Sequence, residues 1–162
     1  DIITAAAEIK GDEFVIEIGP GIGSLTQAVL EKLDSGKMLA VEKDAAMVEV
    51  LEDIFAGEKK LSLLNQDALK INWEDVESEY NSENRKMKLI ANLPYYVTTP
   101  IIMGVLESDL KLDQMVFMVQ KEVGERICAG PGTKKFGSLS VAVQYHMQTE
   151  IVHQVPSSVF IP

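Results

Sequence analysis

Short apolar runs alternate with longer amphipathic segments along almost the whole chain. This alternation is typical of a parallel sheet with crossover helices, because a parallel neighbour can be reached only by a long return connection. We therefore expect an α/β fold with a mostly parallel sheet and helices on both faces. The predicted strands are Glu13–Ile18, Lys37–Glu42, Leu61–Asn65, Lys88–Ala91, Gln114–Val119 and Thr149–Val155. The predicted helices are Ile2–Ile9, Leu25–Lys32, Ala45–Phe55, Pro100–Glu107, Lys121–Cys128 and Leu139–His146.

Two segments are harder to assign from their pattern. The last predicted helix overlaps Ser138–Val143, where polar and apolar residues alternate as they do in a strand, so a strand remains an alternative there. Asp75–Arg85 is polar and lacks glycine. We expect the latter segment to be a surface excursion before the fourth strand.

Composition and charge bound the class of protein. The 162 residues are 46% hydrophobic and 25% charged, as expected for one soluble globular domain. The net charge of −10 argues against a nucleic acid partner, because phosphate contacts dominate such binding. However, residues 1–90 hold 19 acidic and 10 basic side chains, whereas residues 91–162 hold 6 and 5. Four of the five basic side chains in the nearly neutral part are Lys121, Arg126, Lys134 and Lys135. They either contact phosphates or belong to solvated surface.

Several features bear on location. Cys128 is the single cysteine, which excludes an internal disulfide and fits a reducing compartment. The sequence has no signal peptide and no apolar stretch long enough to span a bilayer, so we expect a cytoplasmic protein without a membrane partner. Asp1 lies inside a predicted helix without a cap, and Pro162 follows the last predicted strand. We therefore expect a fragment of a longer protein, truncated at both ends.

A glycine-rich turn joins the first predicted strand to the second predicted helix, with the sequence Glu17-Ile18-Gly19-Pro20-Gly21-Ile22-Gly23. Glycines let the backbone approach a ligand closely, and Ser24 or Thr26 could cap the helix. The G-x-G-x-G spacing differs from the dinucleotide fingerprint G-x-G-x-x-G. Glu17 would repel a pyrophosphate but attract a cation, such as the methionyl ammonium group of S-adenosylmethionine. A purely structural turn is the alternative.

Acidic residues also end the next two predicted strands. Glu42 lies about 20 residues after the glycine turn, where nucleotide-binding α/β folds place a carboxylate on the ribose hydroxyls. Pairing with Lys43 is its alternative role. Asp67 follows the third strand and could accept from an adenine amine while the Ala68 backbone N–H donates to the ring. Asp67 could instead cap a turn.

The stretch Asn92-Leu93-Pro94-Tyr95 directly follows the apolar run of the fourth predicted strand. Ligands of open α/β sheets bind outside the carboxyl ends of the strands. Polar side chains at these ends therefore contact a ligand more often than they pack in the core. An amide oxygen and a freed backbone carbonyl can accept from an exocyclic amine, Pro94 fixes the bend, and Tyr95 offers a face for stacking. The stretch therefore suits a planar base such as adenine, although an ordinary turn is the alternative.

In order and spacing, these features resemble the ribosomal RNA adenine N6-dimethyltransferases over essentially the whole chain. Further segments look like the bacterial small-subunit (KsgA-type) branch. These are Tyr96–Pro100, Gln120–Val123, Phe136–Ser140, Val155-Pro156 and Phe160–Pro162. The resemblance implies a Rossmann-like class I methyltransferase fold and a catalytic domain spanning residues 1–162. It also implies that an amino-terminal Gln-x-Phe-Leu segment, a seventh strand and a helical carboxyl-terminal domain are missing.

The same resemblance implies a reaction and a site. Methyl groups would pass from S-adenosylmethionine to N6 of adenines, expected to be two adjacent adenines near the 3′ end of small-subunit ribosomal RNA within an immature 30S-type subunit, with a monomeric enzyme. The implied catalytic residues are Asn92, Leu93, Pro94, Tyr95 and Phe160. The implied cofactor-binding residues are Glu17, Gly19, Gly21, Glu42, Lys43, Asp67, Ala68 and Asn92. No metal is expected, because His146 and His153 lack clustered partners.

Three other functions remain open. A DNA adenine N6-methyltransferase would share the cofactor turn and a similar Asn-Pro-Tyr device. A methyltransferase acting on another substrate would keep Glu17, Glu42 and Asp67 but need no stacking platform at Tyr95. A non-catalytic ribosome-assembly factor could retain the fold and bind immature subunits.

Overall fold

The structure, a computed structural model, describes residues 2–93, 97–108 and 110–156. The chain divides into two compact units, residues 1–118 and residues 119–162. The prediction of a single cofactor-binding domain over residues 1–162 stays a prediction. No helix in the described part of the chain is long and apolar enough to cross a membrane.

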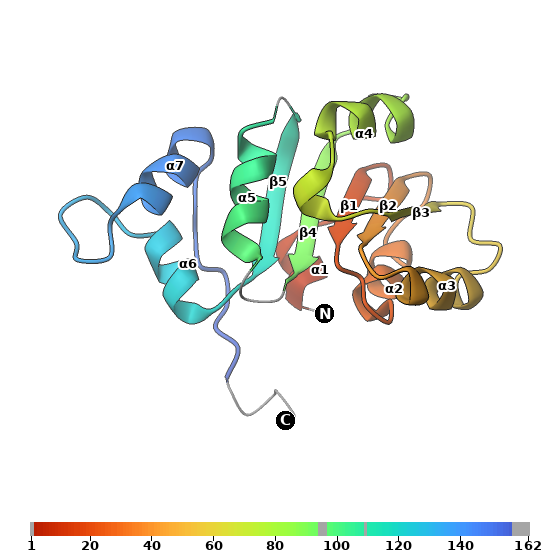
Figure 1. Cartoon of the computed structure of the whole chain (residues 1–162), viewed down its shortest axis with the longest axis horizontal. Helices are drawn as coiled ribbons and strands as arrows, with labels where there is room; N and C mark the ends of the chain where they lie inside the picture. The colour runs from red at the N-terminus through yellow and green to blue at the C-terminus, as the bar shows by residue number, and fades with distance from the viewer. Residues whose placement is uncertain (1, 94–96, 109, 157–162) are drawn as a thin grey trace. The chain divides into compact units, whose positions relative to one another are not determined.

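The first unit contains a parallel sheet of five strands in the order β3-β2-β1-β4-β5 (Figure 1). The strands are β1 (Phe14–Ile18), β2 (Lys37–Glu42), β3 (Leu61–Asn65), β4 (Met87–Asn92) and β5 (Leu112–Met118). The predicted parallel sheet is confirmed, as are its first five strands to within two residues at either end. Because the order reverses direction beside β1, the carboxyl ends of β1 and β4 flank the switch point at which open α/β sheets bind ligands.

The helices follow the predicted alternation. Those of the first unit are α1 (Ile2–Ala6), α2 (Ser24–Leu30), α3 (Ala45–Ile54), the 3₁₀ turn η1 (Ala68–Lys70), α4 (Trp73–Tyr80) and α5 (Thr98–Leu106). The second unit contains α6 (Lys121–Ile127) and α7 (Ser138–His146). The helical prediction for residues 139–146 is thereby confirmed over its strand alternative.

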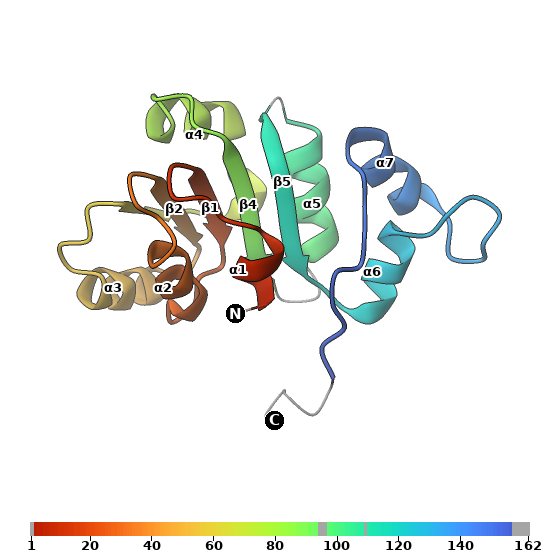
Figure 2. The same ribbon diagram turned by 180° about the vertical axis from the view of Figure 1, so that it is seen from behind.

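Both faces of the sheet are apolar, which explains why its strands read as nearly continuous hydrophobic runs. On one face, Val15 and Ile90 pack with Val29 of α2 and with residues of α1. On the other face, the core includes Ile16 and Leu89 together with residues of α4 and α5. The two layers of helices can be followed in Figure 1 and, from behind, in Figure 2, where α1 lies in front of β4. Helices on both faces are therefore confirmed.

The expectation of a surface excursion over residues 75–85 is wrong for its first half. Helix α4 occupies Trp73–Tyr80, and the Asn72 side chain caps it by accepting from Glu74 N. Only Trp73 and Val76 of this helix are buried. Because its remaining face is charged and solvated, two apolar positions gave too weak a helical period to be recognised.

The predicted sixth strand is also not formed. Residues 147–156 adopt no regular secondary structure, and Ile151 and Val152 are exposed. A strand gains its stability from hydrogen bonds to a neighbour. In the described part of the chain no strand pairs with residues 149–155. Their apolar character alone therefore does not make them a strand.

Candidate active site

The sheet register brings the predicted site residues to one edge. Ile18 at the end of β1 pairs with Val41 of β2 and Ala91 of β4, and Glu42 pairs with Asn65 of β3. Asp67, Glu42, the glycine turn and Asn92 therefore follow four adjacent strands, in that spatial order. Neighbouring strands lie about 4.8 Å apart, so the row extends over roughly 14 Å.

The glycine turn needs its glycines for two different reasons. Gly19, Gly21 and Gly23 have φ values of 70°, 56° and 84°, a region that side chains with a Cβ rarely adopt. A Cβ added at Gly23 would also lie 2.6 Å from Cε2 of Phe55 and 3.0 Å from Cδ2 of Leu51, so the end of α3 packs against this residue. A Cβ at Gly21 would meet nothing within 4 Å. The backbone at Gly21 thus borders open space that a ligand can approach.

The start of α2 differs from the prediction. Its N-cap is Gly23, and no side-chain hydrogen bond caps it, so neither Ser24 nor Thr26 has the capping role proposed from the sequence. The Thr26 hydroxyl instead donates to Oε2 of Glu17 at 2.6 Å. This bond joins the end of β1 to α2, on either side of the glycine turn in the sequence.

Glu17 is a buried acid. Its side chain is 1% exposed, on the side of β1 that faces α2. Burial raises the pKa of Glu17 to about 7, the hydrogen bond from Thr26 opposes that rise, and the nearby Glu42 carboxylate adds to it. A carboxyl group with this pKa is poised between its neutral and charged forms at neutral pH. A cation arriving nearby would favour the charged form.

Glu42 joins the glycine turn to α3. Its Oε2 accepts from Gly21 N at 3.4 Å, and its Oε1 accepts from Asp44 N at 2.9 Å. Asp44 in turn caps α3 by accepting from Ala46 N. Each carboxylate oxygen keeps a further lone pair, so the half-buried Glu42 can still accept from hydroxyl groups of a ligand.

Asp67 forms an ion pair and caps a turn. Its Oδ2 lies 2.9 Å from Nζ of Lys43, and its Oδ1 accepts from Leu69 N at 3.1 Å. The hydrogen bonds from the Lys43 ammonium and from Leu69 lower the pKa of Asp67. The turn-capping role is therefore confirmed. It does not exclude a ligand, since a carboxylate can accept several hydrogen bonds.

Asn65 is a residue that sequence reasoning missed. Its Nδ2 donates to the carbonyl oxygens of Glu42 at 2.9 Å and of Lys43 at 3.2 Å. Gln66 N also donates to the Glu42 carbonyl, at 3.0 Å. These bonds fix the end of β2 beside the end of β3. An amide at a strand end, one position before Gln66-Asp67, was the signal that could have identified it.

Asn92 ends β4 opposite Met118 of β5, and its side chain is exposed. Leu93 is 5% exposed, and its Cδ2 lies 3.8 Å from the Cβ position of Gly19. Leu93 thus packs beside the glycine turn while Asn92 stays accessible. Pro94, Tyr95 and Phe160 lie outside the described residues, and their roles stay predictions.

Metal ligands do not gather at this edge. Among the described residues, no group of three or more His, Cys, Asp or Glu side chains is arranged to hold a metal ion. The chemistry supported by the described residues is therefore hydrogen bonding and charge placement by carboxylates, an amide and backbone groups.

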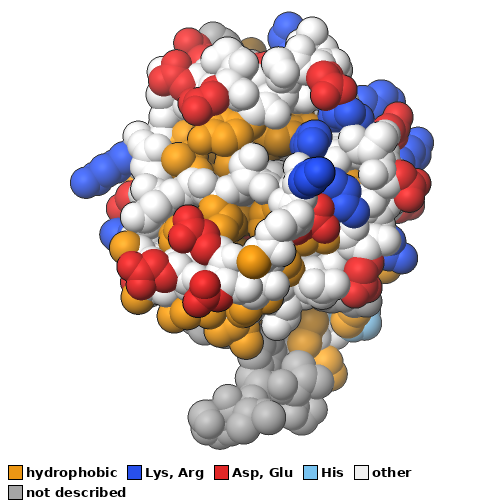
Figure 3. Space-filling model, turned by 90° about the vertical axis from the view of Figure 1, so that its right-hand side faces the viewer, with side chains coloured by type: hydrophobic (Ala, Val, Ile, Leu, Met, Phe, Trp, Pro, Cys, Tyr) orange, Lys and Arg blue, Asp and Glu red, His pale blue; other side chains and the backbone are white. Residues whose placement is uncertain are grey.

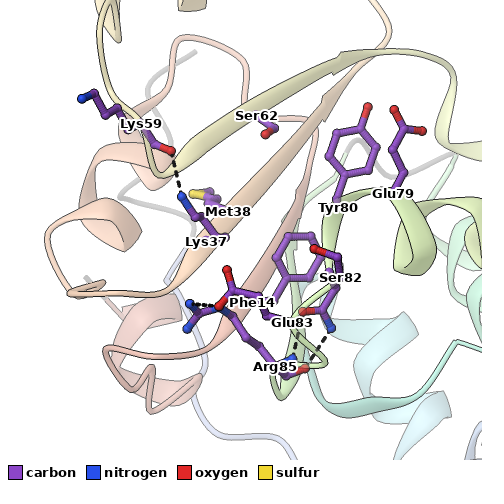
Figure 4. A pocket seen from close by; sticks show the side chains of 11 residues that line it. Phe14, Lys37, Met38, Lys59, Ser62, Glu79, Tyr80, Ser82, Glu83 and Arg85 are labelled. Carbon is purple, nitrogen blue, oxygen red and sulfur yellow. Dashed lines mark hydrogen bonds and ion pairs between the residues drawn. The ribbon is translucent and has the colours of Figure 1, made fainter.

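A polar groove of about 190 Å³ lies at the opposite, amino edge of the sheet (Figure 4). Its lining includes Lys37, whose Nζ donates to the Lys59 carbonyl at 3.2 Å, and Arg85, which donates to the Asp12 carbonyl and to Glu83. These cationic side chains are held by backbone carbonyls and by the Glu83 carboxylate, and the groove lies at the far ends of the strands from Glu42 and Asn92. It is not the candidate active site.

A protein-family model described as ribosomal RNA adenine dimethylase matches residues 1–162. The chain belongs to this family. The family predicted from the sequence is thereby confirmed.

Curated relatives are similar to this chain over nearly its whole length. Ribosomal RNA small subunit methyltransferase A of Halothermothrix orenii is 49% identical over 162 residues, which are 100% of this chain and 53% of the relative. The protein of the same name from Alkaliphilus metalliredigens is 48% identical over 160 residues, or 99% and 55% of the two chains. The chain spans about half the length of these relatives. Their names confirm the predicted small-subunit branch.

Solved structures agree on the dimethylase fold. A dimethyladenosine transferase from Plasmodium falciparum has a TM-score of 0.71 and 29% identity, covering 89% of this chain and 49% of that one. The 23S rRNA methyltransferase ErmE has a TM-score of 0.61 and 21% identity, covering 78% and 47%. The predicted Rossmann-like methyltransferase fold is confirmed.

Proposed function

We propose that the whole protein transfers methyl groups from S-adenosylmethionine to N6 of adenines in small-subunit ribosomal RNA. The observation that carries this proposal is the row of Asp67, Glu42, the glycine turn and Asn92 at the carboxyl edge of the sheet, in a member of the dimethylase family. The substrate would be two adjacent adenines in an immature 30S-type subunit, and the enzyme would act as a monomer in the cytoplasm.

The described residues fit the cofactor. The open space beside Gly21 would let S-adenosylmethionine approach the backbone of the glycine turn closely. The free lone pairs of Glu42 suit the ribose hydroxyls, and the carboxylate of Glu17 suits the methionyl ammonium group. Asp67 and the Ala68 N–H would bind the adenine ring. Lys43, whose side chain is 75% exposed, can move aside from Asp67 as the adenine amine approaches.

When bound, S-adenosylmethionine supplies an electrophilic methyl group on a sulfonium centre. An adenine amine is a weak nucleophile because its lone pair is conjugated with the ring. The Asn92 side-chain oxygen and the Leu93 carbonyl would accept from the N6–H groups and localise that lone pair towards the methyl group. Held by Glu17, Glu42 and Asp67, S-adenosylmethionine would supply the methyl group that N6 accepts, and N6 would lose a proton to solvent.

The target adenine must leave its stack, because N6 cannot reach a pocket from within a helix. Tyr95 would stack on one face of the base and Phe160 would close the other. Phosphate contacts must come from parts of the surface that are not acidic. On the face seen in Figure 3, acidic side chains are spread widely, while Lys and Arg are most numerous on the right, with a few at the left edge and the top. This distribution favours a localised RNA contact over binding across the whole face.

The test is transfer of labelled methyl groups by the full-length protein to unmethylated small ribosomal subunits, with duplex DNA and mature subunits as competing substrates. We expect incorporation into unmethylated subunits alone, at N6 of adenine. Incorporation into DNA would favour the DNA methyltransferase alternative. Tight binding of subunits without any transfer would favour an assembly factor.

A further inference from the structure

Lys88 and Glu13 form a buried ion pair that the proposed reaction does not use. Lys88 Nζ lies 3.2 Å from Glu13 Oε1, and the two side chains are only 8% and 4% exposed. The other oxygen of Glu13 accepts from Lys10 N at 2.7 Å. Desolvation makes such a pair a poor source of net stability. The contribution of this ion pair therefore lies in the segments of the chain that it holds in place.

The pair sits at the end of helix α1. Lys88 Nζ donates to the carbonyl oxygens of Ala7 at 2.6 Å and of Glu8 at 2.9 Å. Gln114 Nε2 donates to the carbonyl of Ala6 at 3.0 Å. Lys88 and Gln114 are direct partners across β4 and β5. Two adjacent side chains of the sheet thus bind three consecutive carbonyls, which begin at the last residue of the helix.

This anchoring matters because α1 has only five residues, far too few for a helix to be stable by itself. Helix α1 also contacts α2: Ile3 packs in one cluster with Leu25, the second residue of α2, and with Val29. Leu25 follows Gly23 by two positions. Figure 2 shows α1 in front of β4, running from the carboxyl ends of the strands towards their amino ends.

We propose that Lys88 is a positioning residue for the candidate cofactor site: it fixes α1 against the sheet, and α1 in turn braces the first turn of α2 and the glycine turn. Lys88 and Asn92 face the same side of β4, four residues apart, at opposite ends of the strand. One strand therefore carries both the anchor of α1 and the amide assigned to the base. The effect on S-adenosylmethionine binding rests on the proposed function, whereas the effect on the glycine turn does not.

The experiment uses full-length protein and four substitutions. Lys88→Met removes the anchor and Lys88→Arg keeps a cationic donor. Lys60→Met is the matched control, because Lys60 Nζ binds the carbonyls of Leu30 and Leu33 at the opposite end of α2 in the same manner. Gln114→Leu removes a single donor to α1 and serves if Lys88→Met does not fold. Amide hydrogen exchange is measured over residues 2–10, 19–26 and 30–36, and S-adenosylmethionine affinity by calorimetry.

We expect Lys88→Met to speed exchange at least fivefold in residues 2–10 and 19–26, and to weaken S-adenosylmethionine binding about tenfold. Lys88→Arg should restore both, Gln114→Leu should show smaller changes of the same kind, and Lys60→Met should affect residues 30–36 alone. Faster exchange in residues 2–10 with unchanged exchange in residues 19–26 would overturn the inference. If the unsubstituted protein binds no S-adenosylmethionine, the proposed function fails, and the exchange results still decide the role of Lys88.

Discussion

The carboxylate of Glu17 accepts a 2.6 Å hydrogen bond from the hydroxyl of Thr26, and both side chains are almost fully buried. The sequence suggested that Glu17 meets a bound cation directly. The structure adds a protein partner on one of its oxygens, and the contact with a cation stays a prediction. An acid held in this way influences both the stability of the fold and the charge of the site.

Glu17→Gln should change how stability depends on pH. In the unfolded chain this carboxyl titrates near pH 4.5, whereas burial raises its pKa to about 7 in the folded protein. Between these values the folded protein keeps a proton that the unfolded chain has lost, so the free energy of unfolding falls as the pH rises. Glu17→Gln should remove a decline of up to about 3 kcal/mol, as measured by urea unfolding between pH 4.5 and 8. Parallel stability curves for the two proteins would contradict the raised pKa.

Glu42→Ala should weaken S-adenosylmethionine binding. The substitution removes the carboxylate assigned to the ribose hydroxyls, and with it the acceptor for Gly21 N. We expect a loss of roughly 1–3 kcal/mol in calorimetry. Glu49→Ala is the control, because Glu49 is an exposed acid on the neighbouring helix α3. Equal affinities for folded Glu42→Ala and Glu49→Ala proteins would reject the role of Glu42.

Gly21→Ala should weaken S-adenosylmethionine binding, although it should destabilise the fold no more than the control Gly57→Ala does. Gly21 and Gly57 both have positive φ, and a Cβ at either would meet nothing within 4 Å. Backbone strain should therefore cost each alanine variant about 1 kcal/mol, as measured by urea unfolding. Only the Cβ at position 21 would project into the space assigned to S-adenosylmethionine. The prediction fails if Gly21→Ala binds the ligand as tightly as Gly57→Ala does.

Tyr95→Ala should reduce both subunit binding and methyl transfer, because a stacked base is held before and during the reaction. Loss of one stacking contact corresponds to about 1–3 kcal/mol. Tyr95→Phe keeps the ring and should be mild. Binding and single-turnover assays on unmethylated subunits measure both quantities. A strong defect in Tyr95→Phe would point to the hydroxyl group in place of stacking.

Much of the fold follows from periodicity in the sequence, because each parallel strand is a largely apolar run bounded by polar turns. The residues that gather at the carboxyl edge follow as well, since Glu42 and Asn92 come directly after such a run and Asp67 comes shortly after one. The wrong assignments of strands and helices have one cause: the local sequence pattern does not show which segments pack together in the folded protein. Residues 149–155 look like a strand but have no neighbour among the described residues, and α4 hides its buried Trp73 and Val76 among charged positions.

Contacts between side chains could not be read from the sequence either. The bond between Thr26 and Glu17 joins a helix to a strand, and Asn65 reaches back to the end of β2. Sequence spacing placed Thr26 near a helix start and so suggested a cap. The Thr26 hydroxyl donates to Glu17 because a buried carboxyl group without a hydrogen bond costs more free energy than an uncapped helix end that water can reach.

The role of Asn92 is the central claim. In the proposed mechanism, the amide oxygen of Asn92 accepts from the adenine amine as the transition state forms. Asn92→Ala in the full-length protein should therefore lower turnover far more than subunit affinity. The deciding measurement is the single-turnover rate of methyl transfer to unmethylated small subunits, with binding of subunit and S-adenosylmethionine checked in parallel. We predict a fall in rate of at least a hundredfold, or about 3 kcal/mol, with subunit affinity nearly unchanged. A nearly normal rate in an Asn92→Ala protein that still binds both partners would contradict the mechanism.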